Sequence, residues 1–203
     1  LGRAGRAPWR QLLRLSIAGS LQALARGGAL VSGIYAWGIA LLLVLPAAAC
    51  TMLPGMGLRW RGVAGLARLW ASLAGIRLEI RGHDGVKCGP AVFVANHASY
   101  LDVFVLLAAL PHPVRFVAKQ ELSTKRLLAW LLGRLGTLFV ERFDARQGVA
   151  DLQRLGRASM AAPLLFFAEG TFTPREGLRP FRLGAFQLAV DNGLPVIPLA
   201  LSG

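Results

Sequence analysis

Residues 91–110 read AVFVANHASYLDVFVLLAAL, and this stretch decides the fold class. Its first five residues form a short apolar run with valine and phenylalanine, which is typical of a buried strand. A polar loop follows, and the second apolar run, Ser99–Leu110, has the length of a helix. A strand that leads through a short loop into a helix is the unit from which parallel sheets covered by helices are built.

The same alternation of strand-like and helix-like runs extends from residue 76 to the end of the chain. We predict strands over Ile76–Ile80, Ala91–Ala95, Val114–Ala118, Thr137–Val140, Leu164–Ala168 and Val196–Leu201. We predict helices over Ser99–Leu110, Thr124–Leu135, Arg146–Met160 and Leu183–Asn192. Residues 76–203 are therefore expected to form an α/β domain with a mostly parallel sheet, and ligands should bind beyond the carboxyl ends of its strands. The chain starts with Leu and ends on Gly just after a strand-like run, so we expect a partial chain, truncated at its C-terminus.

Residues 1–75 have a different character and are expected to anchor the domain to a membrane. Hydrophobic residues make up 55 % of the 203-residue chain and charged ones 16 %, with a net charge of +13, which excludes a disordered chain or a coiled coil. Nine arginines precede Glu79, which is the first acidic residue in the sequence. A segment that is both cationic and apolar favours an acidic bilayer over nucleic acid as the partner.

An uncharged run of 32 residues separates Arg26 from Arg59. At about 1.5 Å per helical residue, it exceeds a hydrocarbon core of about 30 Å. Pro46 and Pro54 favour a bent, re-entrant or hairpin-like insertion, while a single straight span stays open. Ahead of this run, the residues from Trp9 to Arg26 are interpreted as a basic amphipathic helix that lies among lipid headgroups, with a buried core helix as the alternative.

Polar residues that fold stability does not demand follow three of the predicted strands. At the first strand end, His97 lies in a loop and Asp102 lies in the first turn of the next helix. Such a pair can act as a general base, because the carboxylate fixes the tautomer of the imidazole and raises the basicity of its other nitrogen. The same residues also match a capping box from Ser99 to Asp102 with His97 as an ordinary loop residue, and both interpretations stay open.

The second strand end is Gly136–Arg142, and the third, Phe166–Thr173, places Glu169 and Gly170 directly after an apolar strand. A carboxylate beside a permissive backbone suits the binding of a hydroxyl or a phosphate group. A solvated Arg142 and a simple turn at Glu169 are the structural alternatives. All three polar strand ends are expected at the same edge of the sheet, which favours a functional site.

These residues resemble the glycerolipid acyltransferases, whose type member is the bacterial 1-acyl-glycerol-3-phosphate (lysophosphatidate) acyltransferase. Four blocks occur in the family's order, namely Asn96-His97 with Asp102 (its His-x4-Asp signature), Gly136–Arg142, Glu169-Gly170-Thr171 and Leu194–Pro198. Two weaker segments are similar as well, Ala118–Leu122 with Lys119 and Phe181–Phe186 with Arg182.

The resemblance implies direct acyl transfer from a thioester to the free hydroxyl of a lysophosphatidate, on the cytoplasmic side of the inner membrane. His97 would be the base and Asp102 would orient it. The substrate-binding residues would be Lys119, Arg142, Glu169, Gly170, Thr171 and Arg182. An acyl carrier protein or coenzyme A thioester would be the co-substrate. The sequence has no metal-ligand spacing and no nucleotide-type phosphate loop, so no metal or other cofactor is expected.

One residue departs from the family pattern. Members commonly carry Arg directly after Glu-Gly-Thr, whereas this chain has Phe172, so a phosphate ligand is missing there. Arg175, Arg179 or Arg182 could supply the charge, or the acceptor could be another lysophospholipid or lipid. A non-catalytic basic membrane-binding module is the alternative from another functional class, although it gives no reason for the three polar strand ends. A nucleic-acid binder is disfavoured by the long uncharged run.

Overall fold

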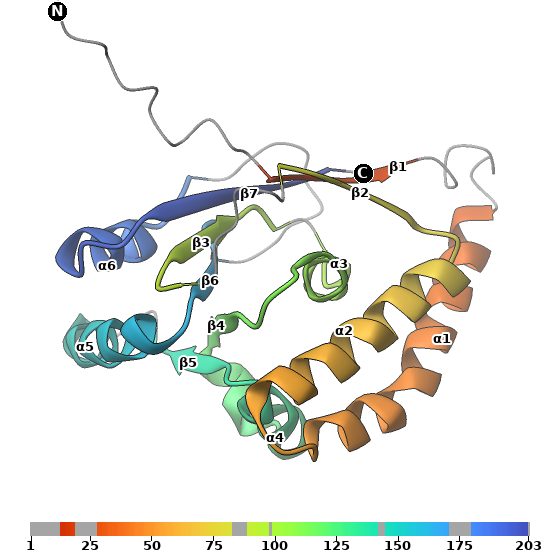
Figure 1. Cartoon of the computed structure of the whole chain (residues 1–203), viewed down its shortest axis with the longest axis horizontal. Helices are drawn as coiled ribbons and strands as arrows, with labels where there is room; N and C mark the ends of the chain where they lie inside the picture. The colour runs from red at the N-terminus through yellow and green to blue at the C-terminus, as the bar shows by residue number, and fades with distance from the viewer. Residues whose placement is uncertain are drawn as a thin grey trace, which may run out of the picture.

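The fold is a seven-stranded sheet with helices on both faces, seen in a computed structural model that describes residues 13–18, 28–82, 89–97, 99–141, 145–170 and 180–202 (Figure 1). The strands are β1 (Leu13–Ala18), β2 (Arg77–Arg81), β3 (Val92–Ala95), β4 (Arg115–Lys119), β5 (Leu138–Val140), β6 (Leu164–Phe167) and β7 (Val196–Ser202). The helices are α1 (Gly28–Thr51), α2 (Met56–Leu73), α3 (Leu101–Ala109), the 3-10 helix η3 (Gln120–Thr124), α4 (Arg126–Arg134), α5 (Ala145–Ala161) and α6 (Gly184–Asp191). All six predicted strands and all four predicted helices are confirmed, with ends that differ by one or two residues.

The strand order is β2-β1-β7-β3-β6-β4-β5, and every neighbouring pair is parallel except β1 with β2. The expected mostly parallel sheet is therefore confirmed. From β3 the chain passes through α3 to β4, whereas from β6 it passes through α6 to β7 on the other side of β3. Connections that leave neighbouring strands in opposite directions create a crevice at the strands' carboxyl ends, where ligands bind in sheets of this kind.

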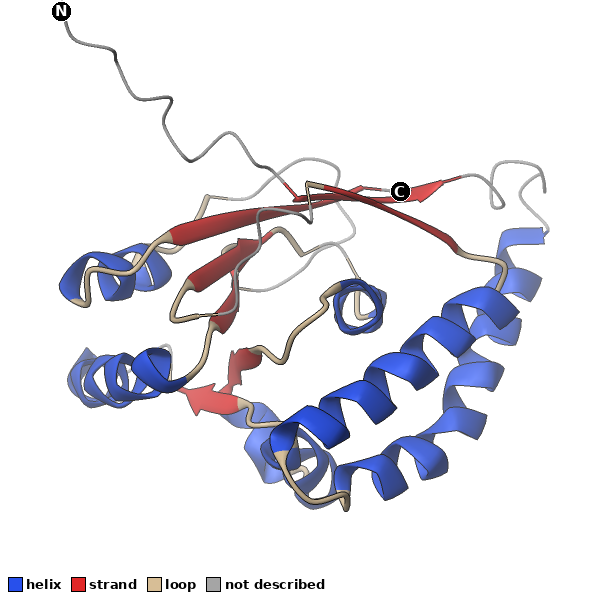
Figure 2. Ribbon diagram, in the orientation of Figure 1, coloured by secondary structure: helices blue, strands red, loops and turns tan. Residues whose placement is uncertain are grey.

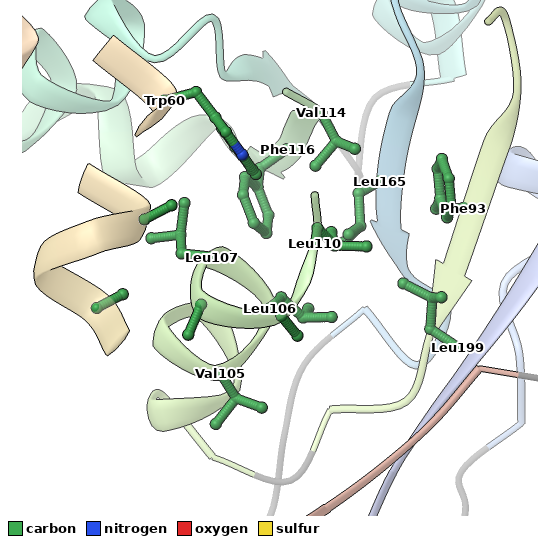
Figure 3. Close-up of a cluster of buried hydrophobic side chains, with 14 of the residues drawn as sticks. Trp60, Phe93, Val105, Leu106, Leu107, Leu110, Val114, Phe116, Leu165 and Leu199 are labelled. Carbon is green, nitrogen blue, oxygen red and sulfur yellow. The ribbon is translucent and has the colours of Figure 1, made fainter. Parts of the chain in front are cut away.

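Two apolar layers cover the two faces of the sheet, because successive side chains of a strand point to opposite faces. Phe93 and Leu165 pack against α2 and α3, whereas Val92, Val94 and Leu164 pack against α5 and α6. Figure 2 shows these helices on either side of the strands. Figure 3 shows the larger layer, with Trp60, Val105, Leu106, Leu107, Leu110, Val114, Phe116 and Leu199 around Phe93 and Leu165. Each fully buried Phe or Leu contributes about 1.5–3 kcal/mol, so these layers hold the crevice in place.

The apolar run forms one continuous helix, α1, with Pro46 inside it. Pro46 therefore removes a main-chain hydrogen bond without ending the helix. A hairpin does form, but its turn lies at residues 52–55, which include Pro54, and its second arm is the amphipathic helix α2. The two arms are in close contact at Gly62, where a Cβ atom would lie 2.8 Å from the Cys50 sulfur.

The predicted amphipathic helix over Trp9–Arg26 is wrong in its described part, since Leu13–Ala18 is the strand β1. β1 pairs with β7 on one side and with β2 on the other, so it belongs to the sheet and not to an anchor. Its sequence alternates Leu13, Leu15 and Ile17 with smaller or polar residues, which is the period of a strand. The rest of the predicted helix lies outside the described residues.

Three arginines, two of them among the nine that precede Glu79, bind main-chain carbonyl groups within the fold. The side chain of Arg134 donates to the carbonyl of Thr51 (2.9 Å) at the end of α1, and Arg59 donates to the carbonyl of Arg134 (3.2 Å) at the end of α4. Arg68 donates in the same way to Ala108 (2.9 Å) near the end of α3. Cations at helix C-termini satisfy unpaired carbonyl groups and oppose the helix dipole. These arginines therefore fasten the helical hairpin to the domain.

Candidate active site

The loop that carries the predicted base leaves the sheet at the end of β3 and is fastened there by Asn96. The side-chain amide of Asn96 donates to the carbonyl of Leu201 (2.9 Å), and its oxygen accepts from the N–H of Leu201 (2.7 Å). Both hydrogen bonds go to the main chain of one residue of β7, so they tie the loop after β3 to that neighbouring strand. The next residue, His97, thereby starts from a fixed main-chain position.

His97 and Asp102 form the pair that the sequence predicts. Nδ1 of His97 lies 2.9 Å from Oδ2 of Asp102, and their side chains are only 13 % and 7 % exposed. The same Oδ2 accepts from the N–H of Ser99 (2.9 Å), while the Ser99 hydroxyl accepts from the N–H of Leu101 (3.1 Å). The His–Asp pair and the capping box were alternatives in the sequence, and one carboxylate oxygen of Asp102 makes the contacts of both.

Two further contacts restrict the histidine. The main-chain N–H of His97 donates to Oε1 of Glu169 (3.0 Å), which follows β6, the neighbour of β3 in the sheet. The imidazole stacks on the ring of Phe167, with centroids 3.9 Å apart and planes inclined by 20°. The imidazole is therefore held in three ways. Asp102 contacts its Nδ1, Glu169 binds the main chain of His97, and Phe167 packs on one face of the ring.

This arrangement defines the protonation of the imidazole. An ionised carboxylate can only accept hydrogen bonds, so a neutral His97 carries its proton on Nδ1, toward Asp102. Its Nε2 then keeps a lone pair that can take a proton from a hydroxyl group, and the carboxylate stabilises the imidazolium that results. His97 and Asp102 have the arrangement of the histidine and aspartate in a serine-hydrolase triad, in which a substrate hydroxyl would take the place of the serine.

Glu169 and Gly170 form a tight turn after β6. The N–H of Gly170 donates to the carbonyl of Phe167 (3.0 Å), and Gly170 has a φ of 73°, a backbone conformation that favours glycine. Glu169 is 8 % exposed, and its Oε1 accepts from the main-chain N–H of His97. Its position therefore holds His97 directly, in a role that the sequence did not assign to it.

The remaining predicted substrate residues lie around this centre to different degrees. Arg182 is exposed, but its N–H donates to the carbonyl of Ala168 (2.8 Å), which places it beside the Glu169 turn. Lys119 is the last residue of β4, at the same carboxyl edge of the sheet as His97. Arg142 and Thr171 lie outside the described residues, next to Glu141 at the end of β5 and to Gly170.

Asn96 and Phe167 are functional-site residues to which the sequence assigned no role. Asn96 precedes His97 in the sequence, and Phe167 lies two residues before Glu169. Their partners come from neighbouring strands: Asn96 binds Leu201, and Phe167 stacks on the ring of His97. Among the residues that the structure describes, no group of three or more His, Cys, Asp or Glu side chains could hold a metal ion.

Comparisons with known proteins show which sequences this chain is similar to. The chain is 33 % identical over 144 residues to a chloroplastic 1-acyl-sn-glycerol-3-phosphate acyltransferase of Brassica napus, covering 68 % of this chain and 42 % of that protein. It is 35 % identical over 174 residues to a lyso-ornithine lipid O-acyltransferase of Pseudomonas aeruginosa, covering 86 % of this chain and 64 % of that protein. The chain thus spans less than two thirds of the length of either relative.

The fold is also similar to a solved structure. The crystal structure of the 1-acyl-sn-glycerophosphate (LPA) acyltransferase from Thermotoga maritima aligns with a TM-score of 0.58 at 16 % identity, over 87 % of this chain and 83 % of that one. The model of the family named Acyltransferase matches residues 77–202, which hold every strand except β1 and both members of the His97–Asp102 pair. The chain belongs to the acyltransferase family.

Proposed function

We propose that this chain transfers a fatty acyl group from a thioester to the free hydroxyl of a lysophosphatidate in phospholipid synthesis. The observation that carries the proposal is the His97–Asp102 pair, nearly buried at the carboxyl edge of the sheet and held by Glu169. The name of the B. napus relative, a 1-acyl-sn-glycerol-3-phosphate acyltransferase, supports this acceptor.

The proposed reaction needs one base and no acyl-enzyme. Nε2 of His97 takes the proton of the acceptor hydroxyl as the hydroxyl oxygen attacks the thioester carbonyl carbon. The carbon–sulfur bond of the tetrahedral intermediate then breaks, and the imidazolium returns the proton to the leaving thiolate. Asp102, 2.9 Å from Nδ1, stabilises the imidazolium between the two steps. The products are the diacylated lipid and the free thiol of coenzyme A or acyl carrier protein.

The acceptor's phosphate would be bound by the cations around the edge, Lys119, Arg142 and Arg182. Arginine presents a planar fork that suits the bidentate binding of phosphate oxygens. The backbone of the turn at Gly170 and Thr171 would contribute N–H groups to the same acceptor. No metal or other cofactor is part of the proposal.

A second acceptor is favoured by two specific observations. The P. aeruginosa lyso-ornithine lipid O-acyltransferase aligns with 86 % of this chain, against 68 % for the B. napus relative. In addition, Phe172 stands where lysophosphatidate acyltransferases commonly carry Arg. Both observations suit an acceptor without a phosphate group, such as a lyso-ornithine lipid. The choice between a lysophosphatidate and a lyso-ornithine lipid is therefore part of the test.

We further propose that α1 holds the enzyme on the cytoplasmic leaflet of the inner membrane. Among the described residues, Gly33–Thr51 is long and apolar enough to cross a membrane, with a mean hydropathy of 2.0, and only 17 % of its span is buried. The first half of α1 also lies near the site, because Ile39 packs in one cluster with Leu101 and Phe104 of α3, the helix that carries Asp102. A lysolipid could then reach the site along α1 from the bilayer.

The proposal is tested by assaying the protein in detergent with radiolabelled acyl thioesters and separating the products. Lysophosphatidate, lyso-ornithine lipid and other lysolipids would be compared as acceptors, and coenzyme A and acyl carrier protein thioesters as donors. Lysophosphatidate is expected to have the highest kcat/KM. A higher value for lyso-ornithine lipid would replace the acceptor, and the absence of any acyl transfer would refute the proposed function.

The base is tested by His97→Ala with His112→Ala as the matched control. His112 is exposed and precedes β4, at the opposite edge of the sheet. Because a general base contributes about 100- to 10,000-fold, His97→Ala should lose at least about 100-fold in rate while His112→Ala keeps the wild-type rate. More than about a tenth of the wild-type rate in His97→Ala would exclude His97 as the base.

A further inference from the structure

Helix α4 is apolar on its outer side although it belongs to a well-packed domain. None of its nine residues is buried. Leu127 is 67 % exposed and Trp130 is 46 % exposed, and residues three apart lie on the same face of a helix. An exposed Leu–Trp row on an amphipathic helix is typical of a surface that another apolar phase covers.

The inner side of α4 is fixed to the helical hairpin. Arg134 at its C-terminus donates to the carbonyl of Thr51, and the carbonyl of Arg134 accepts from Arg59. Figure 1 shows α4 beside the α1–α2 turn, on the side of the molecule away from α5 and α6. The exposed face of α4 is therefore held next to the C-terminal end of the exposed apolar helix α1.

The charges and residue types around α4 indicate which phase covers it. Lys125 and Arg126, at the N-terminal end of the helix, are both exposed cations. Tryptophan with leucine on one face and basic residues at the end is the composition of helices that lie in the headgroup layer of anionic membranes. The exposed apolar side chains of α4 are Leu127, Leu128 and Trp130, and by themselves they offer too little area for a stable contact with a second copy of the chain.

We propose that α4 is a second element that contacts the membrane. This proposal rests on the proposed attachment of α1 to the bilayer. Leu127 and Trp130 reach the acyl chains at the headgroup boundary, and Lys125 and Arg126 bind anionic headgroups. The segment η3–α4 begins directly after Lys119 at the catalytic edge of the sheet, whereas α1 meets α4 at the opposite end. Contacts through both helices fix the tilt of the domain, so that the catalytic edge faces the membrane surface.

The contact is tested by fluorescence labelling of the full chain in sealed vesicles of phosphatidylglycerol and phosphatidylethanolamine. An environment-sensitive dye is attached to Leu127→Cys in a background that carries Cys50→Ala and Cys88→Ser. The matched control is Val190→Cys, because Val190 is 76 % exposed on α6, far from the hairpin. The dye on α4 should be quenched by nitroxides on the lipid acyl chains and protected from aqueous iodide, and the control should show the reverse.

Two results would overturn the proposal. Equal access of iodide to both dyes would place α4 in water, and protection from iodide without quenching by lipid nitroxides would indicate a protein partner, such as a second copy. Neither readout depends on acyl transfer, so the failure of this proposal and the failure of the proposed function are distinguishable.

A kinetic comparison provides a second measurement. Trp130→Ala should raise the KM for an acceptor embedded in anionic vesicles by about five- to tenfold, since one large interfacial side chain is lost. Its KM for a short-chain acceptor in solution should not change. Lys125→Gln combined with Arg126→Gln should weaken activity on anionic vesicles only. Identical kinetics of all three proteins on anionic vesicles would contradict a role for α4.

Discussion

Replacing Asp102 by Asn separates the two roles that its Oδ2 atom combines. Oδ2 accepts hydrogen bonds from Nδ1 of His97 and from the N–H of Ser99, both at 2.9 Å. An asparagine that places its amide oxygen at this position keeps both acceptor contacts and the shape of the side chain. It loses the negative charge, which is needed when His97 becomes an imidazolium.

The loss can be estimated from this geometry. Hydrogen bonds to charged groups contribute about 1.5–3 kcal/mol and neutral ones about 0.5–1.5 kcal/mol, which gives a lower limit of about 1 kcal/mol. Opposite charges about 3 Å apart attract by about 5 kcal/mol at an effective dielectric constant of about 20, which gives the upper limit. The transition state should therefore lose about 3–4 kcal/mol, or about 100- to 1000-fold in kcat. Folding loses only the attraction of the carboxylate to the helix N-terminus, about 0.3–1 kcal/mol.

The assay pairs single-turnover acyl transfer with urea unfolding in detergent, for Asp102→Asn and for Asp102→Ala. Asp102→Ala also removes the acceptor for Ser99, so it should destabilise the protein by about 1–2 kcal/mol in addition to losing activity. If Asp102→Asn kept more than about a third of the wild-type kcat, less than about 1 kcal/mol of transition-state stabilisation would be lost, and Asp102 would be only a helix cap.

The other predictions concern the support of the base, the acceptor and the hairpin. Glu169→Gln keeps an acceptor for the main-chain N–H of His97 and should lose about tenfold in kcat. Glu169→Ala should lose more activity and melt at a lower temperature, because a buried donor left unpaired costs about 1–3 kcal/mol. An alanine variant that matches the wild type in rate and in melting temperature would contradict this role of Glu169. Arg142→Ala should raise the KM for a phosphate-bearing acceptor without changing kcat, and an unchanged KM in steady-state assays would make Arg142 an ordinary surface residue. Gly62→Ala should destabilise the folded chain by about 1–3 kcal/mol, because the new methyl group would press on Cys50. The control Gly65→Ala, whose methyl group would meet no atom within 4 Å, should stabilise the helix by up to about 1 kcal/mol. Shifts in melting temperature of the same sign for both variants would refute the close contact between the helices.

The predicted elements that were confirmed share a local signal. β3, β4 and β6 are short apolar runs bounded by Pro, Gly or polar residues, and the helices between them have longer periodic patterns. The pair of His97 and Asp102 is also local, because five residues separate them along a loop and the first turn of a helix. Such features depend on neighbours in the chain, so a single sequence contains them.

The strand β1 shows where this reasoning fails. Leu13–Ala18 lies in a cationic, apolar segment that also suits an amphipathic helix, and six residues are too few to separate a period of 2 from one of 3.6. A helix makes its hydrogen bonds within itself, whereas a strand depends on partners elsewhere in the chain. The partners of β1 are β2 and β7, which begin at Arg77 and Val196, and no pattern within residues 13–18 contains them.

The amino-acid sequence by itself determined the α/β class, the sheet edge where polar residues gather and the pairing of His97 with Asp102, because these follow from apolar runs and short spacings. Only the tertiary structure decided how His97 is held. Glu169 binds the main chain of His97 across 72 residues, and Asn96 binds Leu201 across 105. Contacts of this kind exist only when β3, β6 and β7 lie side by side, and the burial that brings those strands together is a property of the whole chain.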